Sequence, residues 1–270
     1  MKKIKQILLL GCDVSRSHSS ILSNKEKYKR SDSMLVVLIN EETGKVALVS
    51  FMRDIWVYFD GYGEDRINTA ILKNGPKLAI KTINDYFNLN IDDYILLNME
   101  NFVYIVDELG GVDVNLTDEE AYYINQQIDD VKEIINYKGE AIQLDDSGLN
   151  HLNGLQTLTH VCDRYFGFCW KRGERQREVL KALMYKAKNH TSKSKMVLLG
   201  VKMLKYVKTS LSIFDIFSLA KVALKVNPSE VKTHCVPSEG TYEMVNDGIW
   251  HFEIDFVENS KQLQELINSL

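Results

Sequence analysis

The 270-residue sequence is poor in the features that would place it in several common classes of protein. It has only three prolines and shows no repeat or low-complexity stretch, so nothing in it looks like a flexible linker between domains. Its four cysteines lack the C-x-x-C spacing of a structural zinc site. The net charge of −4 argues against general nucleic-acid binding. We therefore expect a single domain over residues 1–270, with two tightly joined domains as the alternative.

Long hydrophobic runs are also missing. The N-terminus, MKKIKQILLLGC, is similar to a signal peptide ending in a lipoprotein-type cysteine, but its apolar run, Ile7 to Leu10, is too short for that or for a membrane span. This run is better interpreted as a buried first strand. We interpret the cysteines as thiols, while a pair between Cys162 and Cys169 stays open in an oxidising setting.

Strand and helix patterns alternate along the chain. Apolar runs at Ile7 to Leu10, Met34 to Ile39 and Val46 to Phe51 predict three strands, the last two joined by a hairpin. Helical patterns follow Gly75-Pro76 and again from Asp118 to Ile135, with short strands between them. This rhythm predicts an α/β sandwich.

The segment from Arg164 to Arg177 is strongly basic, with five basic residues and one acidic residue. Read as a helix from about Lys171, it has a core-facing stripe at the spacings i, i+3, i+4, i+7, i+8 and i+11. The members of this stripe are Arg172, Arg175, Gln176, Val179, Leu180 and Leu183. A buried guanidinium needs a counter-charge, and a helix N-terminus favours an anion. The pattern indicates either a phosphate site or ion pairs with carboxylates of the chain itself.

Polar residues also stand at the ends of the first three predicted strands. Asp13 follows the first, Asp32 precedes the second and Arg53 follows the third. If the first two strands are antiparallel neighbours, both carboxylates lie at one sheet edge, where they suit Mg²⁺. The alternative is that Asp13 caps a turn and Asp32 pairs with Arg30.

The order of several short runs resembles the LytR-CpsA-Psr family. Each run is weak alone, but their order and spacing together are specific. The runs are ILLLGCDVSR, RSDSMLVVLINEETGKVALVSFMRD, RINTAI, GPKLAIKTINDYF, VYIVDELGGVDV, LNGLQTL and RGERQREVLKAL. The resemblance spans about Ile7 to Leu183 and continues more weakly to the end.

This resemblance implies a three-layer α/β/α sandwich with a central mixed sheet flanked by helices. It also implies an extracytoplasmic, membrane-anchored phosphotransferase of Gram-positive bacteria that uses Mg²⁺. Such an enzyme moves a glycopolymer, for example teichoic acid or capsule, from a polyprenyl pyrophosphate carrier to peptidoglycan. Its membrane anchor would precede the first strand, and this chain would then be the soluble domain.

The resemblance further assigns site residues. It makes Asp13 and Asp32 the metal ligands and, with Arg53, the catalytic residues. The pyrophosphate ligands would be Arg53, Arg164, Arg172, Arg175 and Gln176. Apolar helices would form a slot for the prenyl tail.

The sequence departs from the family pattern after the LNG motif. The family usually has an Arg-x-Arg pair where this chain has Cys162, Asp163 and Arg164, and a thiol supplies neither the charge nor the donors of a guanidinium. Two further functions are kept open. One is a non-catalytic protein that binds polyprenyl phosphates or pyrophosphates, and the other is a pyrophosphatase acting on the same lipids.

Overall fold

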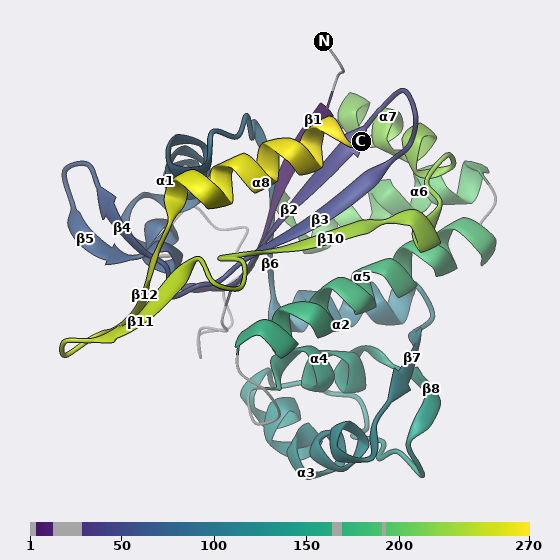
Figure 1. The fold of residues 1–270 in the computed structure, drawn as a ribbon. Helices are drawn as coiled ribbons and strands as arrows, with labels where there is room; N and C mark the ends of the chain where they lie inside the picture. Colours follow the sequence, from purple (N-terminus) through teal and green to yellow (C-terminus); the bar gives the residue numbers. More distant parts are fainter. Residues whose placement is uncertain (1–3, 13–28, 164–168, 191–192) are drawn as a thin grey trace.

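A central six-stranded sheet organises the protein. The computed structural model describes residues 4–12, 29–163, 169–190 and 193–270. The strand order is β10-β3-β2-β1-β6-β9 (Figure 1). Its members are β1 (Ile4–Cys12), β2 (Ser31–Asn40), β3 (Val46–Phe51), β6 (Asp93–Asn98), β9 (Lys208–Thr209) and β10 (Lys232–Val236). Because β1 is antiparallel to β2 and parallel to β6, the sheet is mixed, as predicted.

Three two-stranded ribbons and eight α-helices complete the described parts of the fold. The ribbons are β4 (Trp56–Phe59) with β5 (Gly63–Arg66), β7 (Val112–Leu116) with β8 (Gly148–Leu152), and β11 (Tyr242–Asn246) with β12 (Trp250–Ile254). The helices are α1 (Ala70–Phe87), α2 (Met99–Glu108), α3 (Asp118–Ile134), α4 (Gly154–Cys162), α5 (Cys169–His190), α6 (Lys193–Met203), α7 (Ile213–Ala223) and α8 (Phe256–Asn268).

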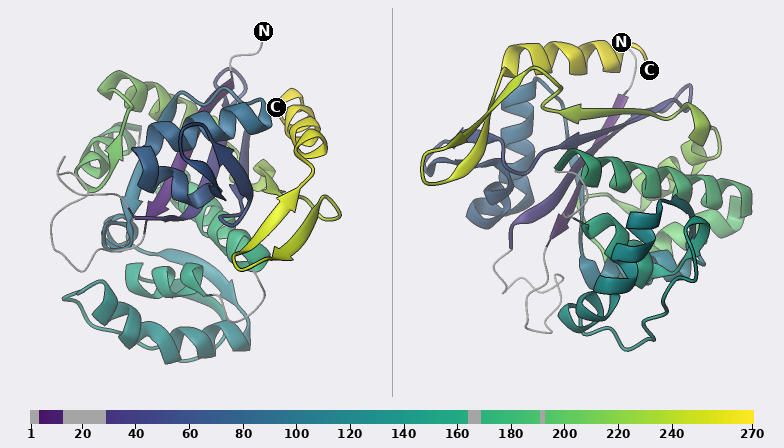
Figure 2. Two further views of the ribbon diagram at one scale, coloured as in Figure 1. Left: turned by 90° about the vertical axis from the view of Figure 1, so that its left-hand side faces the viewer. Right: turned by 60° about the horizontal axis from the view of Figure 1, so that its bottom comes forward.

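Helices cover both faces of the sheet, which gives the three predicted layers. Alternate side chains of a strand point to opposite faces, so Leu8 and Leu10 join the core under α1 and α8. Leu9 points to the other face, toward α5. Figure 2 shows α8 and the α3–α4 pair on opposite sides of the sheet.

A second core lies away from the sheet, among α2, α3, α4, α5 and the β7–β8 ribbon. Helix α3 begins with a capping box, in which Thr117 accepts from the Glu120 amide and Glu120 accepts from the Thr117 amide. Helix α4 approaches α2 closely, since a Cβ on Gly154 would lie 2.2 Å from the Val103 carbonyl oxygen. Only glycine fits there.

The structure corrects several predicted boundaries. Helix α1 includes an additional turn from Ala70, but its backbone is non-helical at Asn74 and Gly75, so the helix that ends at Phe87 starts after Gly75, as predicted. The strands β8 and β11 were not predicted, because each is a short, half-polar strand of a two-stranded ribbon. Across the described residues, every helix is too short or too polar to cross a membrane.

Candidate functional site

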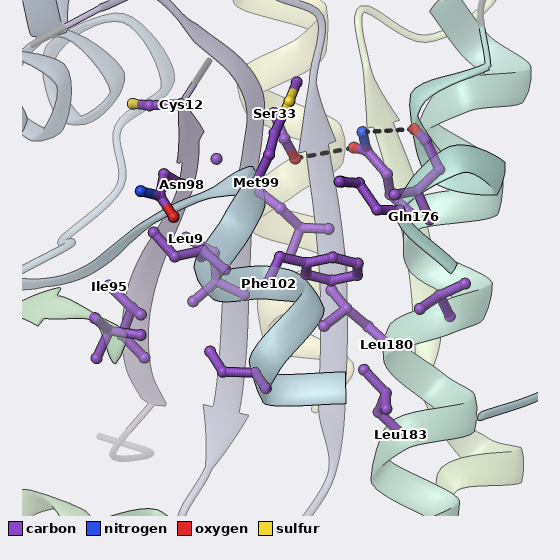
Figure 3. A pocket seen from close by; sticks show the side chains of 18 of the residues that line it. Leu9, Cys12, Ser33, Ile95, Asn98, Met99, Phe102, Gln176, Leu180 and Leu183 are labelled. Atoms are coloured by element: carbon purple, nitrogen blue, oxygen red, sulfur yellow. Dashed lines mark hydrogen bonds between the residues drawn. The ribbon is translucent and has the colours of Figure 1, made fainter. Parts of the chain in front are cut away.

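A large apolar cavity lies between the sheet and the helices on its α5 side. Its volume is about 580 Å³. Figure 3 shows Leu9 of β1, Phe102 of α2, and Leu180 and Leu183 of α5 around it. Further apolar lining comes from Leu35, Ile95, Leu97, Met99, Ile105, Val131, Ile134, Leu158, Val161, Val179, Met203, Leu204, Val207, Leu211 and Ile216. A surface of this kind suits a hydrocarbon chain.

Polar side chains line the same cavity where β1, β2 and β6 meet the first turns of α5. They are Asp32, Ser33, Asn98, Arg172 and Gln176. Ser33 donates a hydrogen bond of 2.9 Å to Gln176 Oε1 (Figure 3). A smaller cavity of about 30 Å³ shares Asp32, Ser33, Arg172 and Gln176 with the large one and adds Arg53 to its lining. The site therefore joins an apolar slot to a polar, partly cationic end.

Asp32 and Arg53 meet at this end because of the strand topology. Strand β1 is antiparallel to β2, and β2 is antiparallel to β3, so the start of β2 lies beside the end of β3. Arg53 Nη1 lies 2.6 Å from Asp32 Oδ1, and Arg53 Nε lies 3.0 Å from Asp54 Oδ2. Burial alone would lower the pKa of the Arg53 guanidinium, but Asp54 and Asp32 outweigh burial and raise it. Arg53 is therefore a fixed positive charge, and Asp32 pairs with Arg53 rather than with Arg30, the partner given by the alternative interpretation of the sequence.

The predicted stripe of α5 is buried. Arg172, Arg175, Val179 and Leu183 are at most 9% exposed. Gln176 lies one turn after Arg172, and its side-chain amide is 3.5 Å from the Val161 carbonyl oxygen. Arg172 and Gln176 thus reach the polar end of the cavity from the same face of the helix.

Arg175 has a different environment. Its Nη2 donates to the Asp163 backbone carbonyl at 2.7 Å and lies 3.2 Å from the Asp163 carboxylate. Its Nη1 lies 3.6 Å from Glu120 Oε1 of α3. Arg175 lines neither of the two cavities described above. For this arginine the structure shows the ion pairs with the chain's own carboxylates that the sequence left open.

Two predicted site residues, Asp13 and Arg164, lie outside the described residues. Asp13 follows Cys12 directly, and Cys12 is the Cα partner of Ser31, next to Asp32. Cys162 lines the large cavity, as does Cys12. The roles assigned to all these residues stay predictions.

Two polar lining residues were missed from the sequence. Ser33 directly follows Asp32, and it donates its hydrogen bond to Gln176 of α5, a residue 143 positions later in the chain. Asn98 ends β6 and caps α2, accepting from the Asn101 amide. The Asn-x-x-Asn spacing at a strand-to-helix junction was the available signal.

The sequence relationships agree with this geometry. A profile of the LytR_cpsA_psr family matches residues 1–268. The chain belongs to the LytR_cpsA_psr family. The matched residues include those that line the polar end of the site and those that line the apolar cavity.

Family members with known names include two teichoic acid transferases. The polyisoprenyl-teichoic acid–peptidoglycan teichoic acid transferase TagU of Bacillus mycoides is 31% identical over 258 residues, which are 92% of this chain and 73% of TagU. The corresponding TagT of Bacillus subtilis is 26% identical over 264 residues, or 98% of this chain and 75% of TagT. For two other relatives, from Staphylococcus aureus and Streptococcus mutans, the chain spans 57% of their length.

The fold is also shared within the family. A solved structure of TagT with bound octaprenyl pyrophosphate lipid superimposes with a TM-score of 0.69 at 24% identity, covering 99% of this chain and 91% of that one. This likeness shows the fold.

Proposed function

We propose that this protein is a Mg²⁺-dependent phosphotransferase that moves a glycopolymer from a polyprenyl pyrophosphate carrier to peptidoglycan outside the cytoplasm. The supporting observation is the joining of a 580 Å³ apolar cavity to an end lined by Asp32, Arg172 and Gln176. A prenyl pyrophosphate has the same division, with a long hydrocarbon chain and a compact anionic head. The names of the relatives TagT and TagU support a transferase.

The residues of the polar end then bind and orient the pyrophosphate. Arg53 and Arg172 neutralise its charge with planar donor pairs, which suit phosphate oxygens. Gln176, held by Ser33, offers its amide group at the same place. In the proposed reaction an acceptor hydroxyl oxygen bonds to the phosphorus next to the glycopolymer. The bond from that phosphorus to the bridging oxygen breaks, polyprenyl phosphate leaves, and the hydroxyl proton is released.

The available carboxylates fit a magnesium ion. Mg²⁺ is usually held by one or two carboxylates together with water and substrate phosphate oxygens. Asp32 lines the cavity, and we assign Asp13, next to Cys12, as the second ligand. In the described parts of the chain no group of three or more His, Cys, Asp or Glu side chains is arranged to hold a metal. When bound, the ion would stabilise charge on the phosphate oxygens.

A turnover assay tests this function. The substrate is a synthetic polyprenyl pyrophosphate-linked sugar, supplied with or without Mg²⁺ and with or without a peptidoglycan fragment. We expect polyprenyl phosphate to appear only when both are present, and Arg172→Ala to lower the rate about a hundredfold through loss of one charged contact to the phosphate. Tyr122→Ala, an exposed residue on α3, is the matched control and should leave the rate unchanged.

The other outcomes identify the alternatives. Release of polyprenyl phosphate without an acceptor would indicate a pyrophosphatase. Binding without release would indicate a lipid-binding protein, and we would then assign the loss of turnover to Cys162 in the cavity wall. If the protein did not bind this substrate, the proposal of a pyrophosphate-binding site would be wrong.

A further inference from the structure

Helices α6 and α7 have apolar residues facing the cavity and other apolar residues facing solvent. Gly200 and Met203 of α6 and Ile216 of α7 line the large cavity. On their outer side, Phe214 is 81% exposed and Leu198 is 67% exposed, with Ile213 and Phe217 beside them at 48% and 41%. An exposed cluster of this kind marks an interaction surface.

The same segment is strongly basic. Residues 193–225 contain seven lysines and a single acidic residue, Asp215, in a chain whose net charge is −4. Lys202 and Lys205 contact Glu108 of α2. Lys221 is exposed on α7 itself, close in sequence to Phe217. Aromatic side chains among lysines are typical of surfaces that bind anionic lipid headgroups and insert between them.

We propose that the outer face of α6 and α7, formed by Leu198, Ile213, Phe214, Phe217 and Lys221, docks onto an anionic lipid bilayer. Lys221 on this face and the lysine excess of the surrounding segment favour an anionic surface over a second copy of the chain as the occupant. Docking would bring the large cavity close to the bilayer, and only this role of the docking surface rests on the proposed function. Since α6 and α7 also line the cavity, a prenyl chain would enter the cavity from the bilayer past these two helices.

The proposed face and the polar end of the site lie at opposite ends of β1. Asp215 of α7 lies 4.0 Å from Lys5 near the start of β1, so the face lies at the N-terminal end of that strand (Figure 1). Asp32 and Cys12 are at the opposite end of β1, where the strand meets the first residues of β2. The polar end of the site is therefore directed away from the proposed bilayer surface. A lipid whose tail enters past α6 and α7 would present its headgroup to the aqueous side.

Vesicle binding tests the proposal on the full chain. Vesicles of phosphatidylglycerol with phosphatidylcholine are compared with vesicles of phosphatidylcholine alone, by sedimentation at low and high salt. We expect binding to the anionic vesicles, weakened by salt. Phe214→Ser should lower the partition constant about tenfold, and Lys221→Gln about fivefold. Val257→Ser on α8 is the control, because Val257 is also 81% exposed, and it should leave binding unchanged.

Geranyl pyrophosphate, a short water-soluble prenyl pyrophosphate, separates this inference from the proposed function. Phe214→Ser should bind it as the wild type does, which also shows that the variant is folded. If neither protein binds geranyl pyrophosphate but vesicle binding still depends on Phe214, the proposed function fails and the docking surface stands. Equal vesicle binding by wild type and Phe214→Ser overturns the docking surface. So does a wild-type dimer, seen by sedimentation velocity, that Phe214→Ser dissociates.

Discussion

Arg175 and Arg172 lie three residues apart on α5, and the structure predicts opposite consequences for replacing them. Arg175 is 4% exposed and touches both the carboxylate and the backbone carbonyl of Asp163, itself 1% exposed. Replacing Arg175 by Met keeps the volume but leaves the buried Asp163 carboxylate without this cation. Breaking a buried pair in this way costs about 3–5 kcal/mol. We expect that loss in the free energy of unfolding, with little change in affinity for a prenyl pyrophosphate.

Arg172→Lys is the matched variant. It keeps a positive charge on the same helix but loses the planar donor pair at the polar end of the cavity. We expect affinity for geranyl pyrophosphate to fall about tenfold, and the free energy of unfolding to change by less than about 1 kcal/mol. Urea unfolding and calorimetric titration measure the two quantities on the same samples.

A double-mutant cycle completes the test. Asp163→Asn removes the charge that Arg175 compensates, so the pair Arg175→Met with Asp163→Asn should be less destabilised than the sum of the single variants by about 1–3 kcal/mol. The reasoning is refuted if Arg175→Met unfolds like the wild type and loses geranyl pyrophosphate binding. Arg175 would then be a direct pyrophosphate ligand, as the family resemblance implied.

Three further predictions concern the surroundings of the site. Burial lowers the pKa of His160 from 6.5 to about 4; the charge of Arg175 adds to this effect and that of Asp163 opposes it. As the pH falls from 6.5 to 4, the unfolded chain binds the proton before the folded protein does. The free energy of unfolding should therefore fall by about 3 kcal/mol over this pH range. In urea unfolding at neutral and acidic pH, His160→Gln should lose this part of the pH dependence, and equal slopes would contradict it. Cys162→Arg should raise transferase turnover by up to about a hundredfold, with Cys162→Ser as control and an unchanged rate as the contrary result. Gly154→Ala, which meets Val103, should lower the free energy of unfolding by about 1–3 kcal/mol, whereas Gly61→Ala, at an open turn, tests the cost of a positive φ alone.

The strand arrangement around Asp32 and Arg53 was predictable because it depends on local patterns. Two apolar runs joined by the turn before Gly44 specify a hairpin, and the end of its second strand must lie beside the start of its first. The contact between Arg53 and Asp32 follows from that geometry. The three-layer fold followed from the alternation of strands and helices and from the family resemblance.

The different surroundings of Arg172 and Arg175 on α5 were not predictable in the same way. The helical period places Arg172, Arg175 and Gln176 on one buried stripe, but a stripe is wide enough to contact two different neighbours. Which side each guanidinium takes depends on Glu120 of α3, 55 residues earlier, and on Asp163 at the end of α4. A pattern within one helix contains no information about those partners.

The cavity explains why the buried face of α5 can include the charged side chain of Arg172. Protein interiors are close-packed, and side chains that line an empty apolar space lose dispersion contacts. A 580 Å³ space walled by leucine, isoleucine and phenylalanine therefore suits an apolar occupant better than it suits water. Arg172 lines the polar end of that space, so the anionic head of a prenyl pyrophosphate would lie beside the guanidinium while its tail occupied the space behind it. One amphipathic substrate would therefore match both the apolar lining and the buried cation.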